Sequence, residues 1–127
     1  MRYLGIDYGK RRVGVAISDG DGRLAFPETV LANDKNLVEN FKKICAENKV
    51  GVIVLGESRD FKGGANPILK DSYSFKEKIE KELSLPVLLM PEYYSTKQAE
   101  RIQGRGKKID ASAAAIILQS FLDKERK

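Results

Sequence analysis

An almost unbroken apolar run in the middle of the chain sets the strongest limit on its fold. Residues 50–55 consist of Val, Ile and Leu, interrupted only by Gly51, which is typical of a strand covered on both faces. Such a strand needs a layer of structure on each side of its sheet, so we expect an α/β fold. The chain has 127 residues, 42% of them hydrophobic, which is enough for a single domain over residues 1–127 with one core.

Three short strands are expected before this run. Residues 3–6 and 13–17 are β-type segments separated by a turn that contains Gly9, which predicts an antiparallel hairpin. Residues 24–31 follow a second turn and predict a third strand of the same meander. Pro27 favours an edge position for that strand, because proline has no N–H group to donate to a neighbouring strand.

The rest of the chain alternates between helical and strand patterns. Apolar residues recur at helical spacing from residue 33 or 34 to about 48 and again from Pro67 to residue 83. A buried strand is expected at 86–90, a short helix from Ser95 to about 103, and a final helix opened by Asp110 as its N-cap. The predicted fold is a mixed five-stranded sheet, three antiparallel strands then two further strands, flanked by helices.

The absence of histidine removes many kinds of enzyme chemistry. The chain has no histidine and a single cysteine, Cys45, which excludes an internal disulfide, a histidine zinc site and a Ser-His-Asp triad. Carboxylates, amines and hydroxyls remain, together with any metal that carboxylates can hold.

Four carboxylates fall at the ends of predicted elements. Asp7, Glu57 and Glu92 end predicted strands, and Asp110 opens the final helix. The carboxyl ends of strands in an open α/β sheet are the usual ligand site, so these acids are expected to converge there. Oxygen ligands without histidine or thiolate favour Mg²⁺ or Mn²⁺, and two such ions in a carboxylate cage suit phosphodiester hydrolysis.

Each acid also has a purely structural interpretation. Asp110 could serve only as a helix N-cap, Glu57 could pair with Arg59, and Glu92 could be a solvated loop acid. Asp7 is the hardest to explain in this way, because it interrupts an apolar segment with no evident structural gain.

Basic residues gather immediately before Asp110. The segment 97–108 holds five basic residues against one acid, within a chain of net charge +5, and its Arg105, Lys107 and Lys108 are candidates for contact with phosphate. The alternative is a solvated surface loop. Tyr8 and the tyrosines at 93 and 94 could stack on unpaired bases, although such residues more often pack as partial core.

Two motifs resemble the YqgF, or RuvX, family of RNase H-like proteins. Residues 7–16 (DYGKRRVGVA) match its D-x-G-x-x-R-x-G-x-A signature, and residues 110–119 (DASAAAIILQ) match its final helix. The resemblance covers essentially the whole chain and implies an RNase H-like fold. It also implies a divalent-metal site from Asp7, Glu92 and Asp110, with Arg12 and the Lys107–Lys108 region near the nucleic-acid backbone. Lys10 is a further candidate for nucleic-acid binding.

The chain departs from the family pattern at two places. The family usually has Asp-Glu-Arg before its Ser/Thr-Thr pair, whereas here Glu92 lies between Pro91 and Tyr93. The family usually reads Gly-Leu-Pro after the buried strand, whereas this chain has Glu57 after Gly56. Related junction resolvases also place an acid there, so Glu57 is expected as a fourth ligand.

The resemblance implies a nuclease that processes the 5' end of pre-16S rRNA in ribosome biogenesis. A Holliday junction resolvase and a nucleic-acid-binding module without catalysis remain alternatives, the latter because of the changed neighbours of Glu92. An ATP-binding phosphotransferase is a third alternative, but such an enzyme needs two domains of this kind to enclose a nucleotide, and 127 residues supply one. The first residues form no signal peptide and no apolar stretch suits a membrane span, so we expect a cytoplasmic protein, monomer or homodimer, with nucleic acid (precursor rRNA or branched DNA) as its partner.

Overall fold

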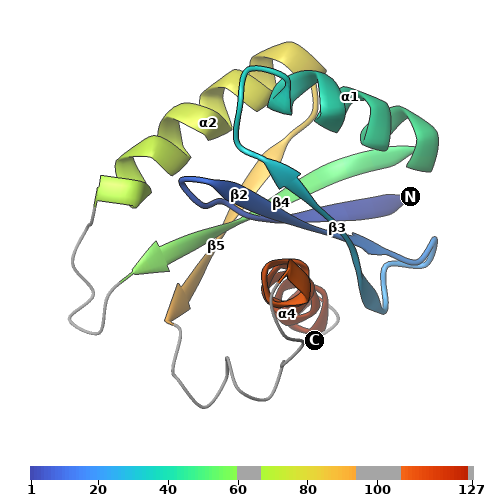
Figure 1. The fold of residues 1–127 in the computed structure, drawn as a ribbon. Helices are drawn as coiled ribbons and strands as arrows, with labels where there is room; N and C mark the ends of the chain where they lie inside the picture. Colours follow the sequence, from blue (N-terminus) through green and yellow to red (C-terminus); the bar gives the residue numbers. More distant parts are fainter. Residues whose placement is uncertain (60–66, 94–106, 126–127) are drawn as a thin grey trace.

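Five strands form one mixed sheet in the order β3-β2-β1-β4-β5 (Figure 1). The computed structural model describes residues 1–59, 67–93 and 107–125. The strands are β1 (Arg2–Asp7), β2 (Arg12–Ser18), β3 (Ala25–Ala32), β4 (Val50–Arg59) and β5 (Val87–Tyr93).

The pairing of the strands confirms the predicted meander. β1 pairs with β2 and β2 with β3 in antiparallel fashion, whereas β4 is parallel to both β1 and β5. β3 is an edge strand, as Pro27 predicts. Pro27 lies opposite Ala16 and Thr29 opposite Val15, so the register shifts at Glu28, where the chain has one extra residue.

Helices cover both faces of the sheet. Figure 1 shows α1 (Leu37–Asn48) and α2 (Pro67–Leu83) on one face and α4 (Lys107–Glu125) on the other. α1 begins a few residues later than predicted, because the Asp34 carbonyl accepts a hydrogen bond from the Leu37 N–H (3.1 Å) in a turn before the helix. The short helix predicted from Ser95 to residue 103 lies outside the described residues.

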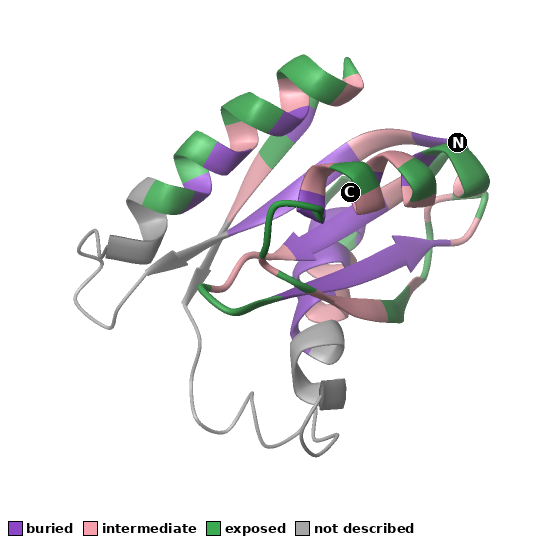
Figure 2. Cartoon of the chain, turned by 45° about the horizontal axis from the view of Figure 1, so that its top comes forward, coloured by how far each residue is buried: buried purple, intermediate pink, exposed green. Residues whose placement is uncertain are grey.

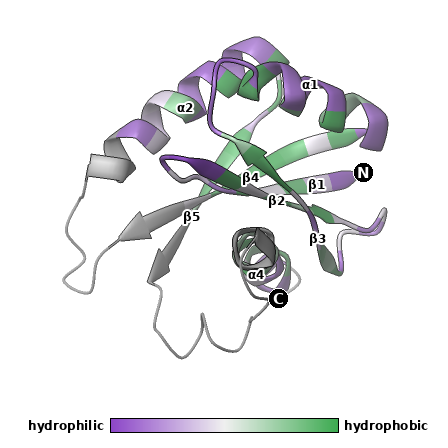
Figure 3. Cartoon of the chain, in the orientation of Figure 1, coloured by the Kyte–Doolittle hydropathy of each residue, from purple (hydrophilic) through white to green (hydrophobic). Residues whose placement is uncertain are grey.

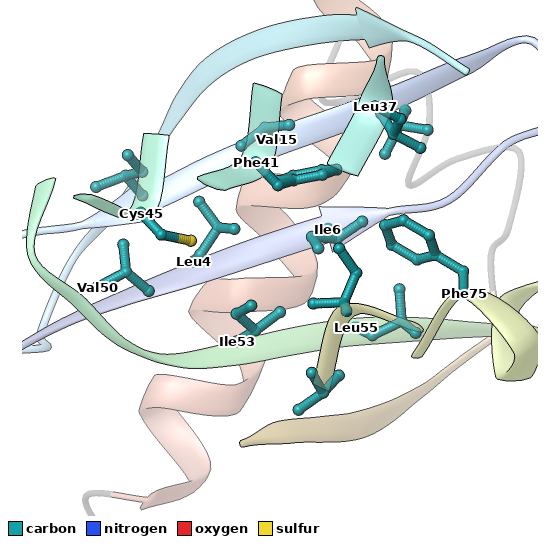
Figure 4. Close-up of a cluster of buried hydrophobic side chains, with 14 residues drawn as sticks. Leu4, Ile6, Val15, Leu37, Phe41, Cys45, Val50, Ile53, Leu55 and Phe75 are labelled. Carbon is teal, nitrogen blue, oxygen red and sulfur yellow. The ribbon is translucent and has the colours of Figure 1, made fainter. Parts of the chain in front are cut away.

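Side-chain alternation along the strands builds one apolar cluster on each face. Leu4, Ile6, Ile53 and Leu55 pack under α1 and α2 (Figure 4). The second cluster lies between the sheet and α4 and includes Ala16, Val54, Ala114, Ile117, Leu118, Phe121 and Leu122. The sheet is therefore covered on both faces, as the run at 50–55 predicts.

The outer surfaces of the helices match this arrangement. In Figure 2, α1 and α2 have buried residues toward the sheet and exposed residues away from it, and Figure 3 shows that their outward positions are mostly hydrophilic. Within the described ranges, no helix is both long and apolar enough to cross a membrane.

Candidate functional site

Asp7 is the last residue of β1, as predicted, and its side chain is half-buried. It lies opposite Gly14 of β2. Alternation along β1 puts Leu4 and Ile6 in the cluster under α1 and α2, so Asp7 belongs to the opposite face with Tyr3 and Gly5. The Asp7 carboxylate is therefore on the α4 face, at the carboxyl end of a central strand.

α4 lies directly against β1 and crosses it at a steep angle (Figure 1). The Tyr3 ring contacts Phe121 with 5.8 Å between ring centroids. A Cβ built on Gly5 would lie 2.7 Å from the Leu118 Cβ and 3.0 Å from the Ala114 carbonyl oxygen, so only glycine fits this contact without displacing α4.

The contacts along β1 shift toward the start of α4. Tyr3 contacts Phe121, whereas Gly5, two residues further along β1, lies against Leu118 and Ala114. Asp7 lies two residues further again, on the side of the crossing that is toward the first turn of α4. That turn contains Asp110.

The structure corrects the predicted role of Asp110 as the N-cap. α4 begins at Lys107, so Asp110 is its fourth residue and lies inside the first turn. An acid in the first turn still interacts favourably with the positive end of the helix dipole. The alanine-rich segment had suggested a start at Asp110, but the helix also includes Lys107, Lys108 and Ile109.

Glu57 and Glu92 lie within strands and not after them. β4 continues to Arg59 and β5 to Tyr93, which places Glu57 opposite Pro91 and Glu92 opposite Ser58. The predicted strand ends at 55 and 90 are therefore too early, because pairing between β4 and β5 extends both strands beyond their apolar residues.

Gly56 lies in β4, the strand between β1 and β5. It lies opposite Met90 of β5, one residue after Leu55, which pairs with Ile6 of β1. A Cβ on Gly56 would collide with the Ile117 side chain. The strip of β4 between Asp7 and β5 thus carries no side chain, and α4 packs close above it.

Several predicted site residues are only partly described. The backbones of Glu57, Glu92, Lys107, Lys108 and Asp110 are placed, but their side chains lie outside the described part, as does all of Arg105. Among the described side chains, no group of three Asp, Glu or Cys residues is arranged to hold a metal ion. Three of the four acids are thus placed by backbone only, and the convergence of the four carboxylates stays a prediction.

The turn between β1 and β2 carries the described basic residues of the site. Lys10 and Arg12 are exposed there. Asn33 was not among the predicted site residues, yet it fixes this turn: its side-chain Nδ2 donates to the Gly9 carbonyl (2.7 Å) and its N–H donates to the Arg11 carbonyl (2.9 Å). Its position after a predicted strand suggested a helix start, and no local pattern indicates these long-range bonds.

Two other residues have structural roles. The Tyr8 ring stacks on Phe75 with 4.7 Å between centroids, so one face of the ring packs as partial core while the residue stays half-buried. Cys45 is buried in the apolar cluster under α1, where burial raises the pKa of its thiol to about 11. A thiol with that pKa is protonated at neutral pH, which argues against a nucleophilic role.

Comparison with known proteins identifies the family. The family model RuvX, described as "Holliday junction resolvase", matches residues 1–124. The chain belongs to the RuvX family. Two RuvX-like relatives share the name "Putative pre-16S rRNA nuclease". The protein of Geobacillus thermodenitrificans is 38% identical over 99% of this chain and 100% of its own length. That of Thermoanaerobacter pseudethanolicus is 33% identical over 99% of both chains.

Solved structures support the same fold. RuvC of Thermus thermophilus superimposes with a TM-score of 0.61 at 12% identity, over 99% of this chain and 97% of that chain. The fowlpox virus Holliday junction resolvase gives 0.59 at 16% identity, over 98% and 99%. The RuvX chain therefore has the RNase H-like fold that its motifs imply.

Proposed function

We propose that this chain is a divalent-metal-dependent endonuclease that hydrolyses phosphodiester bonds in structured nucleic acid. The observation that carries the proposal is the placement of Asp7, half-buried on the α4 face and on the side of the β1–α4 crossing toward the first turn of α4, which contains Asp110. The names of the 33% and 38% identical relatives support precursor 16S rRNA as the substrate. Cleavage in 5' processing is part of our proposal.

The donor set fits a hard divalent cation. Asp7, Glu92 and Asp110 supply only carboxylate oxygens, which suit Mg²⁺ or Mn²⁺. Gly5 and Gly56 let α4 approach the sheet, and this close packing supports a site shared by acids on α4 and on the strands. When bound, the metal would activate water and stabilise the leaving oxygen.

Strand alternation ranks the two glutamates. Positions an even number of residues apart in a strand occupy the same face of the sheet. Position 57 is two residues after Leu55 and four after Ile53, which pack under α1 and α2. Position 92 is two residues after Met90, which packs against the cluster under α4. We therefore assign Glu92 to the metal site with Asp7 and Asp110. Glu57 takes an auxiliary role at the end of the sheet.

The basic residues around this edge would hold the substrate. Lys10 and Arg12 are exposed on the turn that follows Asp7, and Arg105, Lys107 and Lys108 precede Asp110 in the sequence. Cations on both sides of the carboxylates would bind phosphates and so position the substrate, but they would not recognise its base sequence.

A second candidate is a Holliday junction resolvase. The description of the family model favours it, and the chain shares its fold with RuvC of Thermus thermophilus and the fowlpox virus Holliday junction resolvase. Those solved structures are only 12 and 16% identical to this chain, so they support the fold, and the rRNA substrate remains our first choice.

The test uses purified protein with three labelled substrates: a precursor 16S rRNA fragment, a four-way DNA junction and a linear duplex. Each is incubated with Mg²⁺, Mn²⁺ or EDTA. We expect cleavage of the rRNA precursor with metal and none with EDTA. Cleavage of the junction alone would favour the resolvase, and binding without cleavage under any metal would favour the non-catalytic module.

A further inference from the structure

The same end of the sheet has a cavity on its other face. The cavity has a volume of about 240 Å³ and lies between the β1–β2 turn, the loop before α1, and α2. Its wall includes Tyr8 and Phe75. Figure 4 shows Phe75 and Leu37 at one end of the apolar cluster and Cys45 at the other, so the cavity lies at the Phe75 end.

An aromatic pair forms the apolar wall of the cavity. Tyr8 stacks on Phe75 at 4.7 Å and 30°, and Phe75 in turn contacts Phe41 at 5.8 Å. Phe75 is buried, whereas Tyr8 remains half-buried. The Tyr8 ring is thus held in place from the core side, and its remaining surface is a platform on which a planar base can pack.

Hydrogen bonds fix the polar wall. Asn33 ties its loop to the β1–β2 turn through Gly9 and Arg11. In the same loop Asp34 Oδ1 accepts the Asn36 N–H (2.9 Å). A wall that is ordered before binding lowers the entropic cost of holding a ligand, and its carboxylate and amide oxygens can accept the amino group of a base.

Two lysines at the cavity, Lys35 in the loop before α1 and Lys78 of α2, differ from other lysines on α1 and α2. Lys42 of α1 and Lys76 of α2 form ion pairs with glutamates. Lys35 and Lys78 line the cavity and are exposed, and neither forms an ion pair with any described residue. They are therefore available to bind an anion such as phosphate.

We propose that this cavity binds one unpaired nucleotide of the nucleic-acid substrate, with the base against Tyr8 and its phosphates near Lys35 and Lys78. The proposal rests on the proposed function. Tyr8 follows Asp7 directly, so their Cα atoms are about 3.8 Å apart while their side chains lie on opposite faces of the sheet end. A strand crossing the end of β1 can reach both, so the cavity would select substrates with an unpaired nucleotide beside the cleavage point.

The test compares two RNA duplexes by fluorescence anisotropy in EDTA, which separates binding from cleavage. One duplex is fully paired and the other carries a single bulged 2-aminopurine. We expect the wild-type chain to prefer the bulged duplex by roughly ten-fold or more and to change the 2-aminopurine fluorescence. Tyr8→Leu should lose most of this preference, and Tyr8→Phe should keep it because the ring remains.

The lysines are tested with a matched control. Replacing Lys35 and Lys78 by Ala should flatten the slope of log affinity against log salt by roughly 0.7 to 0.9 per lysine. Lys43→Ala removes an exposed lysine of α1 away from the cavity and should leave the preference for the bulged duplex unchanged.

Equal affinity of the wild-type chain for the two duplexes would overturn the proposal, as would a folded Tyr8→Leu variant that keeps the full preference. Circular dichroism establishes the folding of each variant. A retained preference without cleavage in Mn²⁺ would remove the nuclease proposal and support the nucleotide site, so the two proposals fail separately.

Discussion

Gly5 of β1 and Leu118 of α4 pack so closely that there is no room for a side chain at position 5. A Cβ on Gly5 would lie 2.7 Å from the Leu118 Cβ, closer than carbon atoms pack. Because Asp7 lies two residues after Gly5 and Asp110 lies eight residues before Leu118, this contact sets the separation between the elements that carry both acids.

Gly5→Ala should therefore destabilise the protein and disturb the site. Forcing one methyl group into a packed contact costs roughly 1–3 kcal/mol, which corresponds to a fall in Tm of about 4 °C per kcal/mol for a chain of this size. Thermal unfolding followed by circular dichroism measures the effect. Gly20→Ala is the control, since a Cβ there meets nothing within 4 Å. Equal Tm values for both variants would contradict the close packing of β1 and α4.

Asp7→Asn should reduce cleavage by roughly two orders of magnitude or more, equivalent to about 2.7 kcal/mol in the activation barrier. The amide keeps the shape of the side chain but removes the negative charge that a divalent cation needs. Single-turnover cleavage of the rRNA precursor measures the loss.

The matched control for Asp7→Asn is Asp21→Asn, which changes an exposed acid in the turn between β2 and β3. It should cleave at the wild-type rate. Full activity in Asp7→Asn, with folding intact, would remove the proposed metal site.

Local patterns were sufficient to predict most of the fold. Alternating and continuous apolar runs predicted all five strands, and Pro27 predicted the edge strand. The strand ends were wrong at Glu57 and Glu92, because pairing between β4 and β5 extends past the apolar residues. Local hydrophobicity does not encode that pairing.

The geometry around the site depends on contacts between distant segments. The need for glycine at position 5 arises from α4, more than 100 residues away in the sequence. Asn33 likewise bonds to a turn more than 20 residues earlier. Residue types could suggest which acids are candidates to bind metal, but only the packed structure indicates that Asp7 lies on the α4 face.

The two glutamates should respond differently to removal of charge. Glu92→Gln should abolish cleavage, since we place Glu92 with Asp7 in the metal site. Glu57→Gln should weaken metal affinity and be partly rescued by excess Mn²⁺, because an auxiliary ligand raises occupancy without being essential. Cleavage rate is measured against metal concentration for both. Normal cleavage by Glu92→Gln and none by Glu57→Gln at any concentration would reverse the assignment.

Replacing Lys107 and Lys108 by Ala should weaken the dependence of binding on salt. Each lost phosphate contact flattens the slope of log affinity against log salt by roughly 0.7 on single strands and about 0.9 on duplex. Anisotropy titrations at salt concentrations from about 50 to about 200 mM measure this slope. An unchanged slope would mean that these lysines are only solvated surface at the start of α4.

The thiol of Cys45 should report on the opening of the core. Burial raises its pKa from 9.0 to about 11, which lowers the thiolate fraction near pH 8 by about 100-fold, and the residue is buried under α1. We expect alkylation by iodoacetamide at pH 8 to be slow in the folded protein and fast in urea. Because the folded-state pKa is raised, the contribution of Cys45 to stability is full below pH 9 and is lost as the pH rises toward 11. Unfolding free energies of the wild-type chain and of Cys45→Ala, compared between pH 8 and 11, should therefore converge as the pH rises, and a constant difference would contradict the raised pKa.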